Sequence, residues 1–238
     1  HSLDVEAVNC RRTELEIRTA LEVSKAAQEK NFLEQQVSFI DGSLIFWHLE
    51  NKEPSVKHRF LTSYLASLQQ FYEYALVHCG YISSPKSRDL ITLIQYAHHN
   101  TQFSLEHIID SDLVSLFVPI QARTILFKSN SAITSHYPLH LQPFFYYLNT
   151  GSEVVRIELP AWIANNSLLV DMLSAITLDQ IIKGSGYPVC LCEAHEQAVI
   201  KGADRDFFYH AFHQLTVSST QHRYSYSQKL LKKRGIGI

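Results

Sequence analysis

Asp41 is the acidic residue whose surroundings point most directly to chemistry. It ends the apolar segment 38–40, and the turn residues Gly42 and Ser43 follow it at once. A carboxylate at the end of a buried strand is costly to desolvate unless it is paired or binds a metal. We therefore predict that Asp41 is a metal ligand. The alternative is that Asp41 only caps the turn through its own backbone, as Asp-Gly pairs often do.

A second carboxylate could come from the helix predicted over residues 9–30. Its apolar positions Ile17, Ala20 and Leu21 recur on one face. Glu14 and Glu16 lie at opposite edges of this stripe, so either could reach a site at the end of the following strand. Their alternative role is a solvated helix flank, the commoner fate of a surface glutamate.

Residues 186–200 form the other informative stretch, where a short strand is predicted to pass into a helix. Tyr187 and His195 lie here, together with Cys190 and Cys192. A structural zinc is disfavoured, because the two cysteines and His195 have no matching second pair of ligands nearby. The cysteines are better interpreted as small buried hydrophobic side chains. Tyr187 and His195 remain as candidates, since a tyrosine can orient water and a histidine can move protons near neutral pH.

The remaining pattern predicts the elements that must position these residues. A long helix is expected over 57–79 with Gly80 as its C-cap, and further helices over 89–97 and 171–183. Strands are expected at 81–83, 123–129, 144–148 and 154–159, and the strand carrying Asp41 could extend through 45–47. Arg156 and Glu158 fall on one face of a half-buried strand. They could form a cross-strand ion pair, or Arg156 could clamp a phosphate of DNA beside an acidic site.

Length, composition and charge limit the classes of protein to which this chain can belong. The 238 residues are 46% hydrophobic and 18% charged, which predicts one globular domain over 1–238. The formal net charge of −2 gives no global signal for nucleic acid. The basic segment 221–238, with Lys229, Lys232 and Lys233, is either a solvated tail or a contact for the phosphate backbone. No segment is apolar enough to cross a membrane, and four scattered cysteines fit a reducing compartment, so we expect a cytoplasmic protein.

Four segments, in this order, resemble the NurA nucleases. They are Asp-Gly-Ser-Leu at 41–44, Val-Arg-Ile-Glu-Leu-Pro-Ala-Trp at 155–162, Gly-Tyr-Pro-x-x-Leu-x-Glu-Ala-His-x-x-Ala-Val-Ile at 186–200, and the distal basic segment. The similarity spans roughly residues 11–233. The resemblance implies an RNase H-like α/β fold, with a mixed central sheet flanked by helices. It also implies a manganese-dependent, or magnesium-dependent, nuclease that processes DNA ends in double-strand break repair. As partners it implies DNA, a second copy in a homodimer and the hexameric ATPase HerA.

The resemblance also assigns site residues. Asp41 matches the later of the family's two aspartates, and Tyr187 and His195 match its tyrosine and histidine. Glu16 matches the helical glutamate better than Glu14 does, so Asp41 and Glu16 are the expected metal ligands. The family's first aspartate has no counterpart before residue 11. The sequence therefore suggests either an N-terminally incomplete chain, or a degenerate relative that binds DNA or the ATPase without cleaving.

Overall fold

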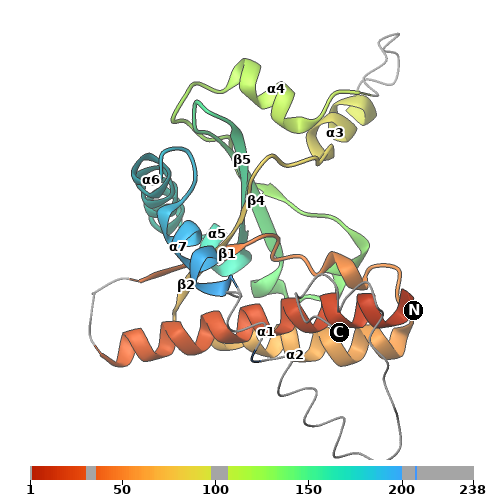
Figure 1. The fold of residues 1–238 in the computed structure, drawn as a ribbon. Helices are drawn as coiled ribbons and strands as arrows, with labels where there is room; N and C mark the ends of the chain where they lie inside the picture. The colour runs from red at the N-terminus through yellow and green to blue at the C-terminus, as the bar shows by residue number, and fades with distance from the viewer. Residues whose placement is uncertain (1, 31–35, 98–106, 200–206, 208–238) are drawn as a thin grey trace, which may run out of the picture. The chain divides into compact units, whose positions relative to one another are not determined.

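The computed structural model describes residues 2–30, 36–97, 107–199 and 207 (Figure 1). The chain divides into two compact units, His1–Glu193 and Ala194–Ile238, and each is described by itself. The first unit contains the sheet and almost every helix. The basic residues Lys229, Lys232 and Lys233 lie outside the described residues.

The described elements are helices and strands of one mixed sheet. The helices are α1 (Ser2–Glu29), α2 (Pro54–Glu73), α3 (Asp89–Ala97), α4 (Asp110–Phe117), α5 (Ala161–Ala164), α6 (Ser167–Lys183) and α7 (Val189–Ala198), with short 3-10 turns η1 (Trp47–Leu49), η2 (Ala132–His136) and η3 (Leu139–Leu141). The strands are β1 (Val37–Asp41), β2 (Val77–Ile82), β3 (Phe127–Lys128), β4 (Pro143–Asn149) and β5 (Val154–Pro160). Their order is β1-β2-β5-β4-β3, with β1 parallel to β2 and the other neighbours antiparallel. A mixed central sheet with helices is thus confirmed, while the RNase H-like topology stays a prediction.

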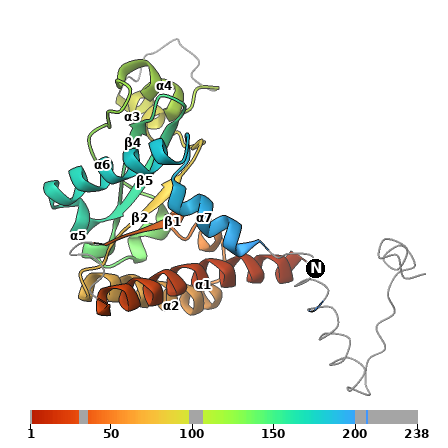
Figure 2. The ribbon, with the colours of Figure 1, turned by 60° about the vertical axis from the view of Figure 1, so that its left-hand side comes forward.

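The described residues form three hydrophobic clusters, and two of them hold the long helices and α6 in place. The long helices α1 and α2 lie side by side, and α3 and α4 lie at the other end of the sheet (Figures 1 and 2). One cluster joins α1 and α2 through Ile17, Tyr64 and Phe71. The other packs α6 against β2, β4 and β5 and includes Ile157 and Leu173. Burial of these apolar side chains, at about 25 cal/mol per Å² of surface removed from water, stabilises both faces of the sheet.

The predicted helix 57–79 is wrong at its C-terminal end. Helix α2 stops at Glu73, where Ala75 takes a positive φ of 50° and the Leu76 amide donates to the Phe71 carbonyl at 2.8 Å. The following residues form the buried strand β2, which contains Gly80. A short apolar run has the same appearance in a buried strand and in a helix, so periodicity placed this boundary too late.

Gly80 is needed for close packing and not for a helix cap. A Cβ at this position would lie 2.6 Å from the Gly42 carbonyl oxygen and 3.2 Å from the Leu44 amide nitrogen. The backbone that follows Asp41 therefore crosses directly over β2. No larger residue fits at position 80 without moving that turn.

Four further expectations need correction. Strand β5 is buried at every position instead of on one face, because α5 and α6 cover one side and other buried side chains the second. The segment 123–129 contributes only the two residues of β3 and an isolated bridge at Arg123. Residues 45–47 leave the sheet, since η1 begins at Trp47. The residues between α6 and α7 form a turn in place of the expected short strand.

Candidate functional site

Asp41 lies at the carboxyl end of the edge strand β1. It is paired in register with Tyr81 of β2, and Gly42 then turns the chain with a φ of 129°. The Gly42 amide donates to the Tyr81 carbonyl at 2.9 Å, which fixes the start of the turn. The Asp41 side chain is exposed. Ligands of open α/β sheets bind outside the carboxyl ends of strands, so Asp41 occupies the position expected of a functional carboxylate.

Tyr187 faces Asp41 from the turn between α6 and α7. Its ring lies edge-on to Tyr81, with 5.4 Å between ring centroids and 89° between ring planes. Burial raises the pKa of the Tyr187 hydroxyl, and the charge of Asp41 and a hydrogen bond to that carboxylate raise it further. The phenol therefore stays protonated at neutral pH, and it lies near the Asp41 carboxylate. The structure thus brings together two of the predicted site residues, with Tyr187 placed to orient the carboxylate.

Glu158 lies beneath the same turn on the opposite face of the sheet. Asp41 shares a face with Tyr81 and Ile157, and the next residue along β5 must point the other way. Glu158 Oε2 accepts hydrogen bonds from Ser43 Oγ at 2.6 Å and from the Leu44 amide at 2.8 Å. The side chain is only 1% exposed. Glu158 therefore fixes the turn that follows Asp41. The sequence signal for such a role is a charged residue between two apolar residues of a strand.

Arg156 completes a buried charge network with Glu158. Its Nε donates to Glu158 Oε1 at 2.9 Å, its Nη1 pairs with Asp89, and its guanidinium stacks on the Phe145 ring at 3.7 Å. Burial lowers the pKa of Arg156, but the charges of the two carboxylates outweigh this and raise it. Of the two sequence interpretations, the ion pair is present, and it runs along one strand. A DNA contact by Arg156 stays a prediction.

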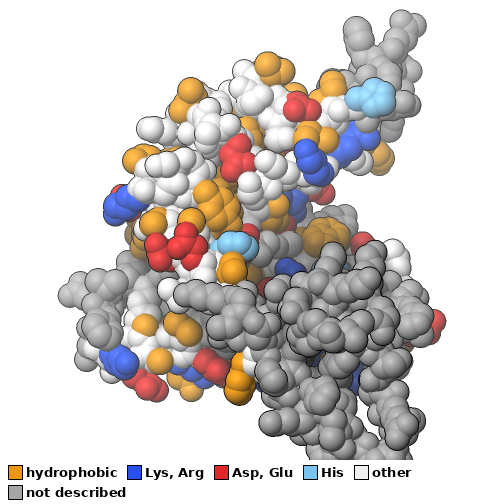
Figure 3. Space-filling view, in the orientation of Figure 1, with side chains coloured by type: hydrophobic (Ala, Val, Ile, Leu, Met, Phe, Trp, Pro, Cys, Tyr) orange, Lys and Arg blue, Asp and Glu red, His pale blue; other side chains and the backbone are white. Residues whose placement is uncertain are grey.

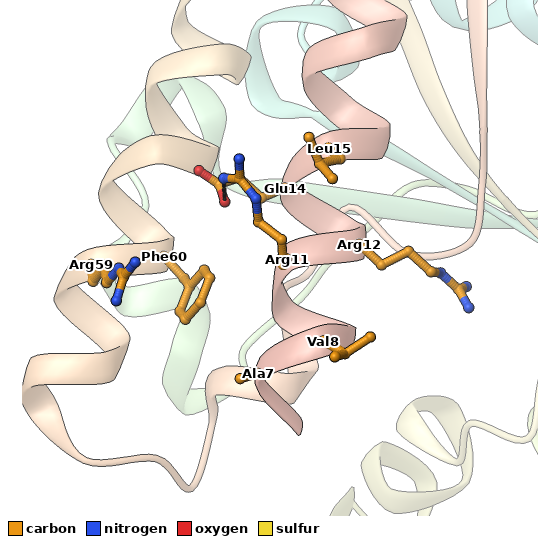
Figure 4. Close-up of a pocket in the computed structure, with 8 residues that line it drawn as sticks. All are labelled: Ala7, Val8, Arg11, Arg12, Glu14, Leu15, Arg59 and Phe60. Atoms are coloured by element: carbon orange, nitrogen blue, oxygen red, sulfur yellow. Dashed lines mark hydrogen bonds and ion pairs between the residues drawn. The ribbon is translucent and has the colours of Figure 1, made fainter. Parts of the chain in front are cut away.

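Glu14 and Glu16 have different surroundings. A cavity of about 810 Å³ between α1 and α2 contains Glu14, which faces Arg11 (Figure 4). Glu14 also accepts a hydrogen bond from Ser63 of α2. Burial raises the pKa of Glu14, but the bonds from Ser63 and Arg11 lower it by more, so its carboxylate is ionised and links the two helices. Glu16 is 46% exposed and pairs with Arg12 at 2.9 Å.

A complete metal site is not formed by the part of the chain that the structure describes. Within it, no three His, Cys, Asp or Glu side chains lie close enough together to hold a metal ion. Asp41 has a tyrosine beside it, and Glu158 already accepts three hydrogen bonds. Asp41 is therefore the candidate carboxylate at this edge, and the assignment of Asp41 and Glu16 as a ligand pair stays a prediction.

His195 and the two neighbouring cysteines lie on α7. His195 belongs to the second unit, where its carbonyl accepts from the Val199 amide at 3.1 Å. Cys190 and Cys192 are exposed free thiols, which corrects the expectation of buried cysteines. The reason is that the apolar face of this helix is formed by Leu191, which is buried between them.

The structure is that of a mixed α/β protein with a carboxylate, Asp41, and a tyrosine, Tyr187, at the carboxyl end of β1. The chain belongs to the NurA family, because the family model for the NurA domain matches residues 4–200. NurA is a family of nucleases. No curated protein and no solved structure matches the chain. Across the described helices, none combines the length and the apolar character that a membrane span requires.

Proposed function

We propose that this chain is a metal-dependent nuclease that hydrolyses phosphodiester bonds at DNA ends during double-strand break repair. Membership of the NurA family over residues 4–200 supports the reaction class. The observation that carries the site is Asp41, exposed at the end of β1 with Tyr187 beside it. A homodimer working with a HerA-type ATPase in the cytoplasm, as the family resemblance implies, belongs to the same proposal.

The roles of the residues follow from their chemistry. Manganese, or magnesium in its place, would neutralise charge on the phosphate and activate water, and oxygen ligands such as Asp41 and Glu16 suit it. Tyr187 stays protonated, and its hydroxyl would orient the Asp41 carboxylate or a bound water. His195 would pass a proton to or from the reacting group, the role that histidine most often takes in general acid–base catalysis.

A second candidate is a NurA-like subunit that binds DNA or the ATPase without cleaving. One observation favours it: Glu158, the buried carboxylate beside the turn, is fully engaged by Ser43, Leu44 and Arg156. It is therefore occupied in holding the turn and is not open to a metal ion. The two candidates differ in whether cleavage accompanies binding.

The test is cleavage of linear DNA with Mn²⁺ and with EDTA. We expect cleavage only with the metal, and Asp41→Asn should lower the rate by about 10²–10³ while DNA binding persists, the effect typical of removing one electrostatic stabiliser. Asp179→Asn is the matched control, because Asp179 is an exposed partner of Lys183 on α6. Wild-type activity in Asp41→Asn would remove this residue from the reaction. Binding without cleavage by the unmodified chain would favour the second candidate.

A further inference from the structure

A cavity of about 660 Å³ lies on the other side of the turn from Asp41. Gly42 and Ser43 form one wall, Trp47 another, and the loop entering α3 a third. Glu158 and Arg156 also line it. Its volume falls in the range of sites that take a small molecule or one unit of a polymer, about 300–1,000 Å³.

Trp47 offers this cavity a flat aromatic surface. Its side chain is 42% exposed, although a tryptophan normally buries most of its surface. The indole Nε1 donates to Ser43 Oγ at 3.0 Å, and two residues further on Leu49 is fully buried and anchors η1. The ring is therefore held in place beside the turn. Exposed aromatic rings of this kind stack on nucleobases without selecting among them.

Cationic side chains stand at the opposite wall. Lys86 is exposed, and it pairs with no carboxylate in residues 2–30, 36–97 or 107–199. Arg88 lines the same cavity, with its Nε donating to the Ile108 carbonyl at 3.1 Å. Figure 3 shows Lys and Arg side chains gathered beside α3. The first amides of α3 are occupied by the Asp110 carboxylate, so an anion here must be bound by these side chains.

The charged side chains of the lining differ in how they are paired. The lining carries three cations, Lys86, Arg88 and Arg156, and two carboxylates, Asp89 and Glu158. Both carboxylates are ion-paired with Arg156. Lys86 ion-pairs with no carboxylate among the described residues, so its exposed ammonium can attract a phosphate.

We propose that this cavity is a nucleotide subsite for single-stranded DNA, in which a base stacks on Trp47 while Lys86 contacts a phosphate. This rests on the proposed nuclease function. The turn that separates the cavity from Asp41 is the direct continuation of the strand that carries Asp41. A DNA strand that crosses this end of the sheet would meet both the cavity and Asp41, so the subsite would anchor a nucleotide close to the reacting phosphate.

The experiment uses tryptophan fluorescence, because the chain has only two tryptophans, Trp47 and Trp162. In the Trp162→Phe variant, Trp47 is the only fluorescent tryptophan. Subtracting the fluorescence of the Trp47→Phe variant from that of the unmodified chain gives a second measure of the Trp47 signal. Oligothymidylate is added in EDTA, so that binding is measured without cleavage. We expect saturable quenching of Trp47, at lower nucleotide concentration than thymidine monophosphate needs.

Two matched variants separate stacking from the Ser43 hydrogen bond. Trp47→Phe and Trp47→Leu both lose the indole donor, and only Phe keeps an aromatic face. We expect Leu to weaken binding by about 5- to 150-fold relative to Phe, the range for loss of one base–aromatic stack. Lys86→Ala should flatten the log–log salt dependence by about one unit. Lys128→Ala, at an exposed position of the opposite edge strand, should leave it unchanged.

Each outcome bears on the proposal. Equal affinity of the Phe and Leu variants, or binding without quenching, would show that the base lies elsewhere. Equal saturation by monophosphate and oligothymidylate would assign the cavity to free nucleotides, and saturation by a phosphopeptide but not by DNA would assign it to a protein partner. Quenching by DNA in a chain that never cleaves would keep the subsite and overturn the nuclease. Cleavage of DNA without any change in Trp47 fluorescence would keep the nuclease proposal and overturn the subsite.

Discussion

Two carboxylates at one end of the sheet have opposite surroundings. Asp41 is exposed and lies near a protonated tyrosine, whereas Glu158 is buried and accepts three hydrogen bonds. A buried carboxylate with its oxygens satisfied stabilises structure, while an exposed one at a strand terminus remains open to a ligand. The difference in burial therefore distinguishes Asp41, the candidate ligand, from Glu158, which supports the turn beside it.

His78 should make the protein sensitive to acid. Its ring lies in β2 against Phe71, with 4.3 Å between ring centroids, and burial lowers its pKa from 6.5 to about 4. The unfolded chain therefore binds the proton more readily between these values. Stability should be full above pH 6.5 and fall as the pH drops toward 4, by about 3 kcal/mol from this group, since each pKa unit corresponds to about 1.4 kcal/mol.

Urea unfolding at several pH values measures this effect. His78→Phe keeps a ring of similar shape and should flatten the fall in free energy of unfolding between pH 6.5 and 4. His48→Phe, at an exposed position, should keep the wild-type slope. Identical slopes in the wild type and His78→Phe would show that other groups cause the acid sensitivity.

The turn between β1 and η1 depends on a contact from a distant strand. Glu158→Gln would place an amide group where Ser43, Leu44 and Arg156 all donate. At least one buried donor would lose its acceptor, and Arg156 would lose its most buried partner. We expect a loss of about 3 kcal/mol or more in the free energy of unfolding, as for other broken buried pairs.

The same unfolding measurement distinguishes the turn from general surface effects. Glu73→Gln is the matched control, because Glu73 accepts only an exposed bond from Gln69, and it should change stability by no more than about 0.5 kcal/mol. Asp89→Asn removes the half-exposed end of the network and should fall between the two. A Glu158→Gln protein as stable as the Glu73→Gln protein would mean that the turn is held by other contacts.

Nucleic-acid affinity in the whole molecule must come from local cations, because the formal net charge is −2. Lys229, Lys232 and Lys233 form the densest basic cluster of the sequence. Replacing the three by Gln should lower the slope of log affinity against log salt by roughly one unit for each phosphate that the variant no longer binds. Titration of DNA at several salt concentrations measures this slope.

A charge-matched control separates direct binding from net charge. Lys57, Lys128 and Lys183 changed together to Gln remove the same charge from described positions outside the basic segment. We expect their slope to stay near that of the wild type. If both triple variants change the slope equally, the basic segment binds no phosphates of its own, and it is solvated or bound to a partner.

The sequence by itself determined the local features of this protein. Apolar spacing predicted α3 and β4 closely and α1 without its first seven residues, and an Asp-Gly-Ser turn marked the end of β1. These patterns depend on neighbours within a few residues. The ordered motifs also indicated the NurA family, which the family match confirms. The boundary between α2 and β2 was misplaced, because a short run of buried apolar residues shows neither the helical nor the strand periodicity.

Only the tertiary structure decided how these elements meet. Ser43 and Glu158 are separated by 115 positions in sequence, and strand order places them in contact. Gly80 could not be recognised as the residue that the turn crosses until β1 and β2 were paired. The cavity beside Trp47 likewise combines three separate segments. Such contacts depend on long-range packing and on the alternation of faces across several strands, which no local pattern in the sequence records.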